Sequence, residues 1–544
     1  MDYLALSPVD NRLTTVYINM NNFLLSTLIF LPLAGAAMVL LLPSAYRDSF
    51  KWISLLVSII NLLNIFTLYN SFDRQITEFQ FVEQHEWIRM SMGNLGFLSI
   101  DYLLGVDGIN MPMILLSGII LMVGSVASFT IGHRQKAYHS LYLLLSGSII
   151  GCFAALDFFL FFLFFEFMLL PMYFLIGIWG GERRESAAIK FFIYTLVGSI
   201  FILVVMIGLS MSVQDSFFSQ EMGGMVHTFD FRQLADFQNY IPNTLLHPVQ
   251  QQLIFGVPAR LFAFVLLIIG FGIKLPVVPF HTWLPDAHVE APTPVSVVLA
   301  GILLKVGAYG FIRIAYGFFP DIAYQFTYIV AGAGVISIIY GAFNALAQED
   351  LKKMIAYSSI SHMGFVLLGL ASMTAEGVNG AIYQMFGHGI LSAMLFLIAG
   401  VIYDRTHNRL IENFRGLSSV MPLFTLVVTV AFFGSLGLPA LPGFIGEFFT
   451  LMGGFQSKVL PDWFSMVAML GIILSAGYFL WTLQKMFFGT FWANRDQQQN
   501  LRDLDFREII MLYSLAVLAV IFGVFPSLIF DITGESVKLF LEKF

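Results

Sequence analysis

The sequence predicts an all-α integral membrane protein, and three observations lead to this fold class. The 544 residues are 58% hydrophobic and only 11% charged, which leaves too little polar surface for a soluble domain of this length. Apolar runs of about 20 residues recur without alternation of apolar and polar positions, so the spans are expected to be helices and not the strands of a barrel. Lysine and arginine gather on alternate connections. Together these features predict about 14 transmembrane helices.

The predicted spans follow one another along the chain. Their centres lie near residues 33, 61, 121, 147, 168, 199, 268, 304, 336, 363, 390, 430 with a second half near 448, 476 and 520. Most of the 27 Lys and Arg residues fall in connections on one side, which the positive-inside rule assigns to the cytoplasm. Two longer and rather acidic connections, 71–110 and 213–258, are expected on the other side. With an even number of spans, both termini are predicted on the side of the membrane opposite the cytoplasm.

The chain also resembles itself. When the sequence is shifted along itself, Asp157 falls on Asp350, and a second alignment places 275–279 (Leu-Pro-Val-Val-Pro) on 438–442 (Leu-Pro-Ala-Leu-Pro). Each shift spans five helices, an odd number, so the second copy is expected to enter the membrane from the opposite face. The sequence therefore predicts two inverted five-helix repeats, each with a proline-broken helix.

These repeats give a predicted organisation in four parts. Residues 1–138 form an N-terminal segment with helices 1 to 3, and residues 139–316 form the first repeat with helices 4 to 8. The second repeat, with helices 9 to 13, covers 317–490, and a loop with helix 14 occupies 491–544.

Three ionisable residues lie within the spans of the first predicted repeat. Glu166 follows a phenylalanine-rich run, where a carboxylate costs about 2.5–3.5 kcal/mol at the centre of a span. Lys274 lies directly before Leu275-Pro276, where the helix is expected to break and free carbonyls that can hold water. Lys305 lies mid-helix among small residues. Each is interpreted as an ion-pathway group, and a Glu166–Lys274 distance that varies would switch the proton on Lys274. The alternatives are a structural ion pair for Glu166 and snorkelling for Lys305.

Three further ionisable residues lie within the second predicted repeat. His362 follows serines, His388 lies between glycines, and Glu447 comes a few residues after the second Leu-Pro-x-x-Pro break. A lone buried histidine can also be a satisfied core residue, and this alternative stays open for His362 and His388. All three are interpreted as carriers of the same pathway.

The segment 279–294 carries His281, Asp286, His288 and Glu290 between prolines, at a cytoplasmic connection. The two histidines are seven residues apart and no Cys lies nearby, so a metal site is not expected. A rigid connection with water-accessible proton uptake is the preferred interpretation. The lone cysteine, Cys152, permits no thiolate cluster. Nucleotide-binding motifs and basic blocks for nucleic acid are lacking in the sequence.

A resemblance to a known family rests on 274–288, 290–296 and 303–307, which run from Lys274-Leu-Pro through His-Thr-Trp-Leu-Pro-Asp-Ala-His to Leu-Leu-Lys-Val-Gly. These segments resemble the signature of the antiporter-like membrane subunits of NADH-quinone oxidoreductase (respiratory complex I) and of Mrp-type sodium/proton antiporters. Glu447 favours the M branch, because the L and N branches and the Mrp proteins generally carry lysine at the matching position. The Asp350-Leu-Lys-Lys segment and a chain that ends soon after its last span agree with this branch.

The resemblance implies a proton channel that uses Glu166, Lys274, Lys305, His362, His388 and Glu447 and that is powered by quinone reduction in other subunits. It implies no cofactor in this chain, with FMN, iron–sulfur clusters and quinone in partner subunits. The expected partners are other complex I membrane subunits, with the L and N subunits on either side, and membrane lipid. The chain would then be an enzyme only as a subunit of a translocase. Two rival functions are an Mrp-type sodium/proton antiporter subunit and a structural membrane subunit with inert ion pairs.

Overall fold

The structure is a computed structural model that describes residues 23–222, 224–249, 252–493 and 501–544. Within these ranges, twelve helical segments are long and apolar enough to cross a membrane. They contain α2 (Leu24–Leu41), α3 (Arg47–Ser71), α4 (Met111–Ala127), α5 (Gln135–Ala154), α6 (Phe158–Phe167) with α7 (Leu169–Trp179), α8 (Arg184–Ser210), α13 (Thr293–Val298) with α14 (Leu304–Gly310), α16 (Thr327–Leu346), α17 (Leu351–Ala371), α18 (Ala375–Thr406), α21 (Trp463–Phe487) and α23 (Phe506–Val524). The predicted class, a helical membrane protein, is confirmed.

Two further spans are interrupted. Helix α11 (Ala259–Lys274) ends at Lys274, and the chain turns before α12 (Trp283–Glu290). Helix α19 (Pro422–Ser435) likewise ends before a turn that leads into α20 (Pro442–Gln456). The predicted Leu-Pro-x-x-Pro segments lie at these two breaks, and the last proline of the second segment, Pro442, begins α20. The helices end here because proline has no N–H to continue a helix. Together with the twelve segments above, these two spans give the predicted fourteen within the described part of the chain.

The helices differ in how much of their surface the chain itself covers. The most apolar windows of 293–316 and of α18 are fully buried, whereas α2, α3, α8 and α21 leave most of theirs uncovered. Their outward side chains include Leu63, Ile193 and Ile473, each more than half exposed. Since such an apolar surface suits lipid and not water, the buried helices form the centre of the bundle and the exposed ones its rim.

The N-terminal caps of α6 and α17 support the predicted repeat. Asp157 accepts a hydrogen bond from the Leu160 N–H at 2.9 Å, and Asp350 accepts one from the Lys352 N–H at 2.8 Å. Each cap residue also forms an isolated antiparallel bridge, with Asp230 and Leu410 respectively. Two residues that align in sequence therefore occupy matching positions in the fold, although the boundaries of the four parts stay a prediction.

The two long acidic connections contain a sheet, where only loops were expected. Strand β1 (Gln80–Ser91) pairs antiparallel with β2 (Phe97–Val106), and β3 (Val226–His227) pairs parallel with β2. Strands can form here because water outside the bilayer satisfies their free edges. The Glu83 carboxylate of β1 accepts the Leu25 N–H at 2.7 Å, which ties the sheet to the start of α2.

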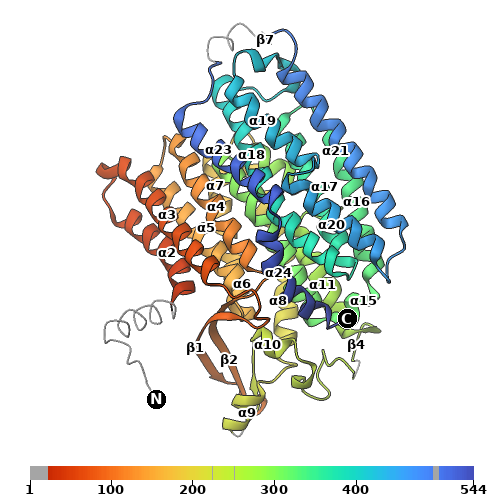
Figure 1. Cartoon of the computed structure of the whole chain (residues 1–544). Coiled ribbons are helices and arrows are strands. Elements are labelled where there is room, and N and C mark those ends of the chain that lie inside the picture. Colours follow the sequence, from red (N-terminus) through yellow and green to blue (C-terminus); the bar gives the residue numbers. More distant parts are fainter. Residues whose placement is uncertain (1–22, 223, 250–251, 494–500) are drawn as a thin grey trace, which may run out of the picture.

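The sheet marks one face of the molecule (Figure 1). Helix α2 begins at this face, and α24 (Ser527–Leu541), a helix that was not predicted, ends there. The opposite face carries the short β6–β7 pair (Phe414–Arg415 and Trp492–Ala493) and most of the basic connections. Below, the first is called the hairpin face and the second the basic face.

Candidate functional site

Lys305 lies at the centre of the bundle with no exposed surface. It follows a π-helical turn, Leu299–Leu303, and a second such turn, Phe311–Tyr316, comes after α14. Widened turns of this kind interrupt the regular backbone pattern and often occur at functional sites. The Lys305 Nζ donates to the Ala300 carbonyl at 2.6 Å and lies 2.7 Å from the Nδ1 atom of His388 on α18. The lysine is therefore joined directly to the next ionisable residue.

His362 and Glu447 continue the same line of groups. The Nδ1 atom of His362, on α17, lies 2.7 Å from an Oε1 oxygen of Glu447, on α20, and both residues are buried. The His362 and His388 rings have centroids 5.6 Å apart. Four side chains from four helical segments thus form the series Lys305, His388, His362 and Glu447, which is called the central chain below.

Only one step of the central chain lacks a direct hydrogen bond, the step between the two histidines. A cavity of about 10 Å³ lies beside both rings. Its lining includes the polar side chains of Ser358, Gln384, Ser392 and Ser435. This volume is close to the minimum that holds a single water molecule, and the hydroxyl and amide groups can bind it. A proton can therefore pass between the imidazoles through one intermediate group.

Glu166 and Lys274 are arranged differently. Within the described part of the chain, the Lys274 Nζ is buried and has no hydrogen-bond partner. It lies 5.1 Å and 5.7 Å from the ring centroids of Phe165 and Phe191. Glu166 is partly exposed, and its charge interacts with that of Lys274 without a hydrogen bond between them. The predicted pair is thus close enough for electrostatic coupling but is not in contact.

Purely structural ion pairs in this protein look different. Arg405 donates two hydrogen bonds to Glu508, at 2.9 and 2.6 Å, and Arg260 donates two to Asp321, at 3.0 and 2.6 Å. Such bidentate pairs satisfy both charges and hold the helix ends together. By contrast, the Glu447 Oε2 and His362 Nε2 atoms are buried without a partner among the described residues. The central chain therefore keeps unused hydrogen-bonding capacity, which an inert pair does not need.

Two buried residues near the basic face were not predicted as site residues. His288 has no exposed surface, and its ring stacks on Phe396 with a centroid distance of 4.3 Å. The Nζ of Lys352 donates to the Ala291 carbonyl at 2.6 Å. The sequence predicted His288 as part of the rigid cytoplasmic connection 279–294, with a metal site not expected there, and placed Lys352 among the basic connections.

A polar cavity of about 820 Å³ opens beside these residues, and its lining includes Glu290, Lys352 and Asp404. It borders 289–294, the end of the segment for which proton uptake was predicted. The cavity is consistent with that hypothesis, which stays a prediction. Within the described ranges, no group of three or more His, Cys, Asp or Glu side chains is placed to hold a metal ion.

Comparisons with known proteins bear on the whole chain. Residues 155–475 match the family model described as NADH:quinone oxidoreductase/Mrp antiporter, transmembrane. The chain is 39% identical to NADH-quinone oxidoreductase subunit M of Rickettsia bellii over 96% of its own length and 99% of the relative's. It is also 39% identical to subunit M of Rhodobacter capsulatus, with 96% and 97% covered. A third relative, NAD(P)H-quinone oxidoreductase chain 4 1 of Synechococcus elongatus, is 38% identical, with 94% and 90% covered.

Solved structures of related membrane complexes contain chains with the same fold. A chain of respiratory complex I from Thermus thermophilus with bound NADH superposes with a TM-score of 0.79 at 28% identity, with 95% of this chain and 99% of that chain covered. A chain of the Mrp complex from Dietzia sp. has the same TM-score at 18% identity, with 96% and 98% covered, which shows a shared fold alone. The named relatives agree with the M branch that Glu447 favours. The chain belongs to the NADH:quinone oxidoreductase/Mrp antiporter family of transmembrane proteins.

Proposed function

We propose that this chain is the proton-translocating M subunit of a bacterial NADH-quinone oxidoreductase. The observation that carries the proposal is the central chain, in which Lys305, His388, His362 and Glu447 lie one after another in the middle of a membrane-spanning bundle. Intramembrane ionisable residues that line up in this way are typical of proton relays. The relatives are named as subunits of NADH-quinone oxidoreductase, which supports this complex as the setting of the relay.

The proposal includes the setting of the chain. The complex lies in the bacterial inner membrane, with the hairpin face and both termini on the periplasmic side and the basic face in the cytoplasm. L and N subunits flank the chain. FMN, iron–sulfur clusters and quinone belong to partner subunits, so this chain acts in a translocase without a redox centre of its own. Its contribution is to carry protons.

Proton transfer along the central chain follows from the contacts. A proton reaches Lys305 from the cavity at the basic face, and the ammonium donates it to the His388 Nδ1, which lies 2.7 Å from Nζ. His388 passes it across the small cavity to His362, and His362 delivers it to the Glu447 carboxylate. Glu447 then releases the proton toward the hairpin face. Each step moves one proton between neighbouring groups that can both donate and accept.

Glu166 and Lys274 are proposed to act as the switch that drives these steps. A buried ammonium is disfavoured unless a carboxylate lies near, so the distance between the two residues decides whether Lys274 holds its proton. Because no hydrogen bond fixes that distance, movements imposed by quinone reduction in partner subunits can change it. A positive charge on Lys274 would in turn oppose a second positive charge on Lys305, and loss of the Lys274 proton would remove that repulsion.

The two rival functions predict different behaviour. An Mrp-type antiporter subunit would be driven by a cation gradient, and it would purify without flavin and iron–sulfur subunits. A structural subunit with inert ion pairs would keep pumping when Glu166 and Lys274 are both replaced by neutral residues. The unpartnered buried atoms of the central chain argue against the inert arrangement, since leaving a buried polar atom unpaired costs about 1–3 kcal/mol.

The test uses the purified complex reconstituted in liposomes, with proton uptake and NADH oxidation recorded together. Lys305→Met should lower the number of protons moved per NADH, or stop both processes, in complexes whose iron–sulfur spectra show normal assembly. Lys458→Met, which removes an exposed lysine of the α20–α21 connection, is the matched control and should change neither. Normal pumping in assembled Lys305→Met complexes would overturn the proposal.

A further inference from the structure

Asp157 lies at the end of α6 nearest the hairpin face, and its side chain joins that helix to the sheet. Only 1% of its surface is exposed. One carboxylate oxygen accepts the Leu160 N–H in the first turn of α6 at 2.9 Å. The other accepts the Asp101 N–H of β2 at 3.3 Å. Since α6 carries Glu166 nine residues further along, about 13 Å at 1.5 Å per residue, Asp157 fixes the end of the helix that positions this carboxylate.

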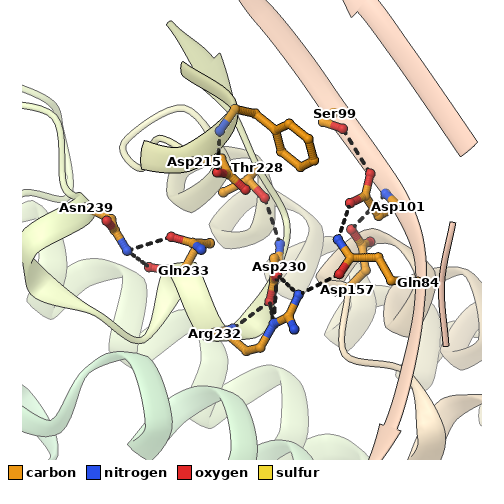
Figure 2. A network of polar contacts seen from close by, with 11 residues as sticks. Gln84, Ser99, Asp101, Asp157, Asp215, Thr228, Asp230, Arg232, Gln233 and Asn239 are labelled. Carbon is orange, nitrogen blue, oxygen red and sulfur yellow. Dashed lines mark hydrogen bonds and ion pairs between the residues drawn. The ribbon is translucent and has the colours of Figure 1, made fainter. Parts of the chain in front are cut away.

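The charges around Asp157 are mainly negative (Figure 2). Asp101 faces it from β2 and is held by Ser99 and Gln84 at 2.9 and 3.0 Å. Asp230 lies across the isolated bridge and accepts a hydrogen bond from the Arg232 guanidinium at 2.6 Å. No Lys, Arg or His within the described residues forms an ion pair with Asp157.

This acidic network lies beside a hollow of about 550 Å³ at the hairpin face. Asp101, Asp215, Asp230 and Arg232 line it, and β1 contributes Glu86 and Arg89, which pair with each other at 3.2 Å. The hollow gives the network access to water. Asp157 does not line it, but it accepts a hydrogen bond from Asp101, which does, so the buried carboxylate lies one residue away from the lining.

The second repeat provides a comparison for Asp157. Asp350 caps α17 at the matching position, but its carboxylate lies 3.4 Å from the Arg409 Nε and is partly exposed. A carboxylate with a guanidinium beside it is held in its ionised form. Asp157 has the same capping role without such a cation.

Burial raises the pKa of Asp157 to about 7, and the charges of Asp101 and Asp230 act in the same direction. The hydrogen bonds from Leu160 and Asp101 act against them. The carboxyl group therefore changes its charge close to neutral pH, whereas an ordinary aspartate does so near pH 4.

We propose that Asp157 is a positioning residue for Glu166 that responds to the proton concentration at the hairpin face. When Asp157 is ionised, its two oxygens accept charge-assisted hydrogen bonds, and its negative charge is stabilised by the positive end of the α6 dipole. When it takes a proton from the hollow, one oxygen becomes a donor and this cap weakens. Helix α6 then holds Glu166 less firmly. As a result, the rate of pumping falls when the pH at the hairpin face, where pumped protons are released, becomes low. This inference rests on the proposed function.

A direct test measures amide hydrogen exchange of α6 in the assembled complex at pH 6 and pH 8, corrected for the intrinsic pH dependence of exchange. About eight-tenths of the Asp157 carboxyl groups change charge between these pH values, so protection at Leu160 and Phe161 should be about fivefold higher at pH 8. In Asp157→Asn the ratio should be close to one. Asp350→Asn is the matched control and should leave the α6 ratio unchanged. Equal protection at both pH values in the unmodified complex would overturn the proposal.

A second test measures pumping in inverted vesicles whose lumen, which faces the hairpin side, is loaded at pH 6 or pH 8. Asparagine resembles the protonated, neutral side chain, so the unmodified complex should pump several-fold faster than Asp157→Asn at lumen pH 8 and about equally at pH 6. If Asp157→Asn does not assemble, Asp157→Ser keeps a neutral cap and takes its place.

The outcomes separate this inference from the function on which it rests. A rate ratio that does not depend on lumen pH overturns the role of Asp157, while a pumping defect in Lys305→Met still supports the central chain. If Lys305→Met pumps normally, the proposed function fails, and the exchange experiment alone still decides whether Asp157 controls α6.

Discussion

In the second half of the molecule, His362 and Glu447 are in contact at 2.7 Å, whereas in the first half Lys274 has no hydrogen-bond partner and its carboxylate, Glu166, is partly exposed. Both regions contain a helix broken by the same Leu-Pro-x-x-Pro pattern. One break places a lysine beside phenylalanine rings, and the other brings a glutamate to a histidine. Under the proposed function, the contacts of the central chain carry protons, while the Glu166–Lys274 pair, which has no such contact, acts through a change in its distance.

The largest effect is expected where a fixed contact is removed. Glutamine at position 447 has no proton to carry, so Glu447→Gln should reduce NADH-driven pumping by about a hundredfold, the lower end of the effect of a lost acid–base group. Glu447→Asp keeps a titratable carboxyl at a longer distance from His362 and should keep part of the activity. Pumping by both variants, with Glu535→Gln as an exposed control, would be measured in reconstituted complexes. Equal and severe loss in both would favour a packing role for Glu447.

A second large effect is expected when the Glu166–Lys274 pair is changed. Lys274→Ala removes the charge that Glu166 controls and should lower pumping several-fold, because Lys305 no longer senses the switch. The double replacement Glu166→Gln with Lys274→Met should not restore pumping, since neutrality is preserved but switching is not. Recovery of pumping in the double variant would show instead that the pair is structural.

The smallest effect is expected at the N-terminal cap of α17. Asp350→Ala removes the side-chain acceptor of the first α17 N–H groups and should destabilise the complex by about 1 kcal/mol, a typical cost for a lost N-cap. Thermal inactivation should occur at a slightly lower temperature, with protons per NADH unchanged. Asp462→Ala, at an N-cap position whose side chain makes no cap hydrogen bond, should not change it. A lower proton ratio in Asp350→Ala would contradict the purely structural role of this cap.

The sequence predicted the membrane class, the number of spans and the two broken helices, because each depends on local patterns such as apolar run length and Leu-Pro-x-x-Pro. It also pointed to six ionisable residues within the spans, since a charge within an apolar run is visible without a structure, and their role in proton transfer stays a prediction. The contacts among them could not be predicted. His388 was predicted as a pathway residue together with Lys305 and His362, but the sequence does not show that it lies between them in space.

Other features were missed for reasons that are also physical. The strands of the hairpin lie outside the bilayer, where no apolar run marks them, and the acidic composition indicated a loop. Lys352 was assigned to a connection because it lies in the first turn of α17, although its side chain turns inward to Ala291. The cap at Asp157 did have a sequence signal, an aspartate directly before a helical apolar run.

The central claim is that Glu447 receives a proton through His362 during turnover. Infrared difference spectra of the complex during NADH oxidation would show this directly, as a carboxyl band that appears and disappears with turnover. The account predicts that this band is lost in Glu447→Gln and also in His362→Ala complexes that still assemble. An unchanged carboxyl band in Glu447→Gln would contradict it.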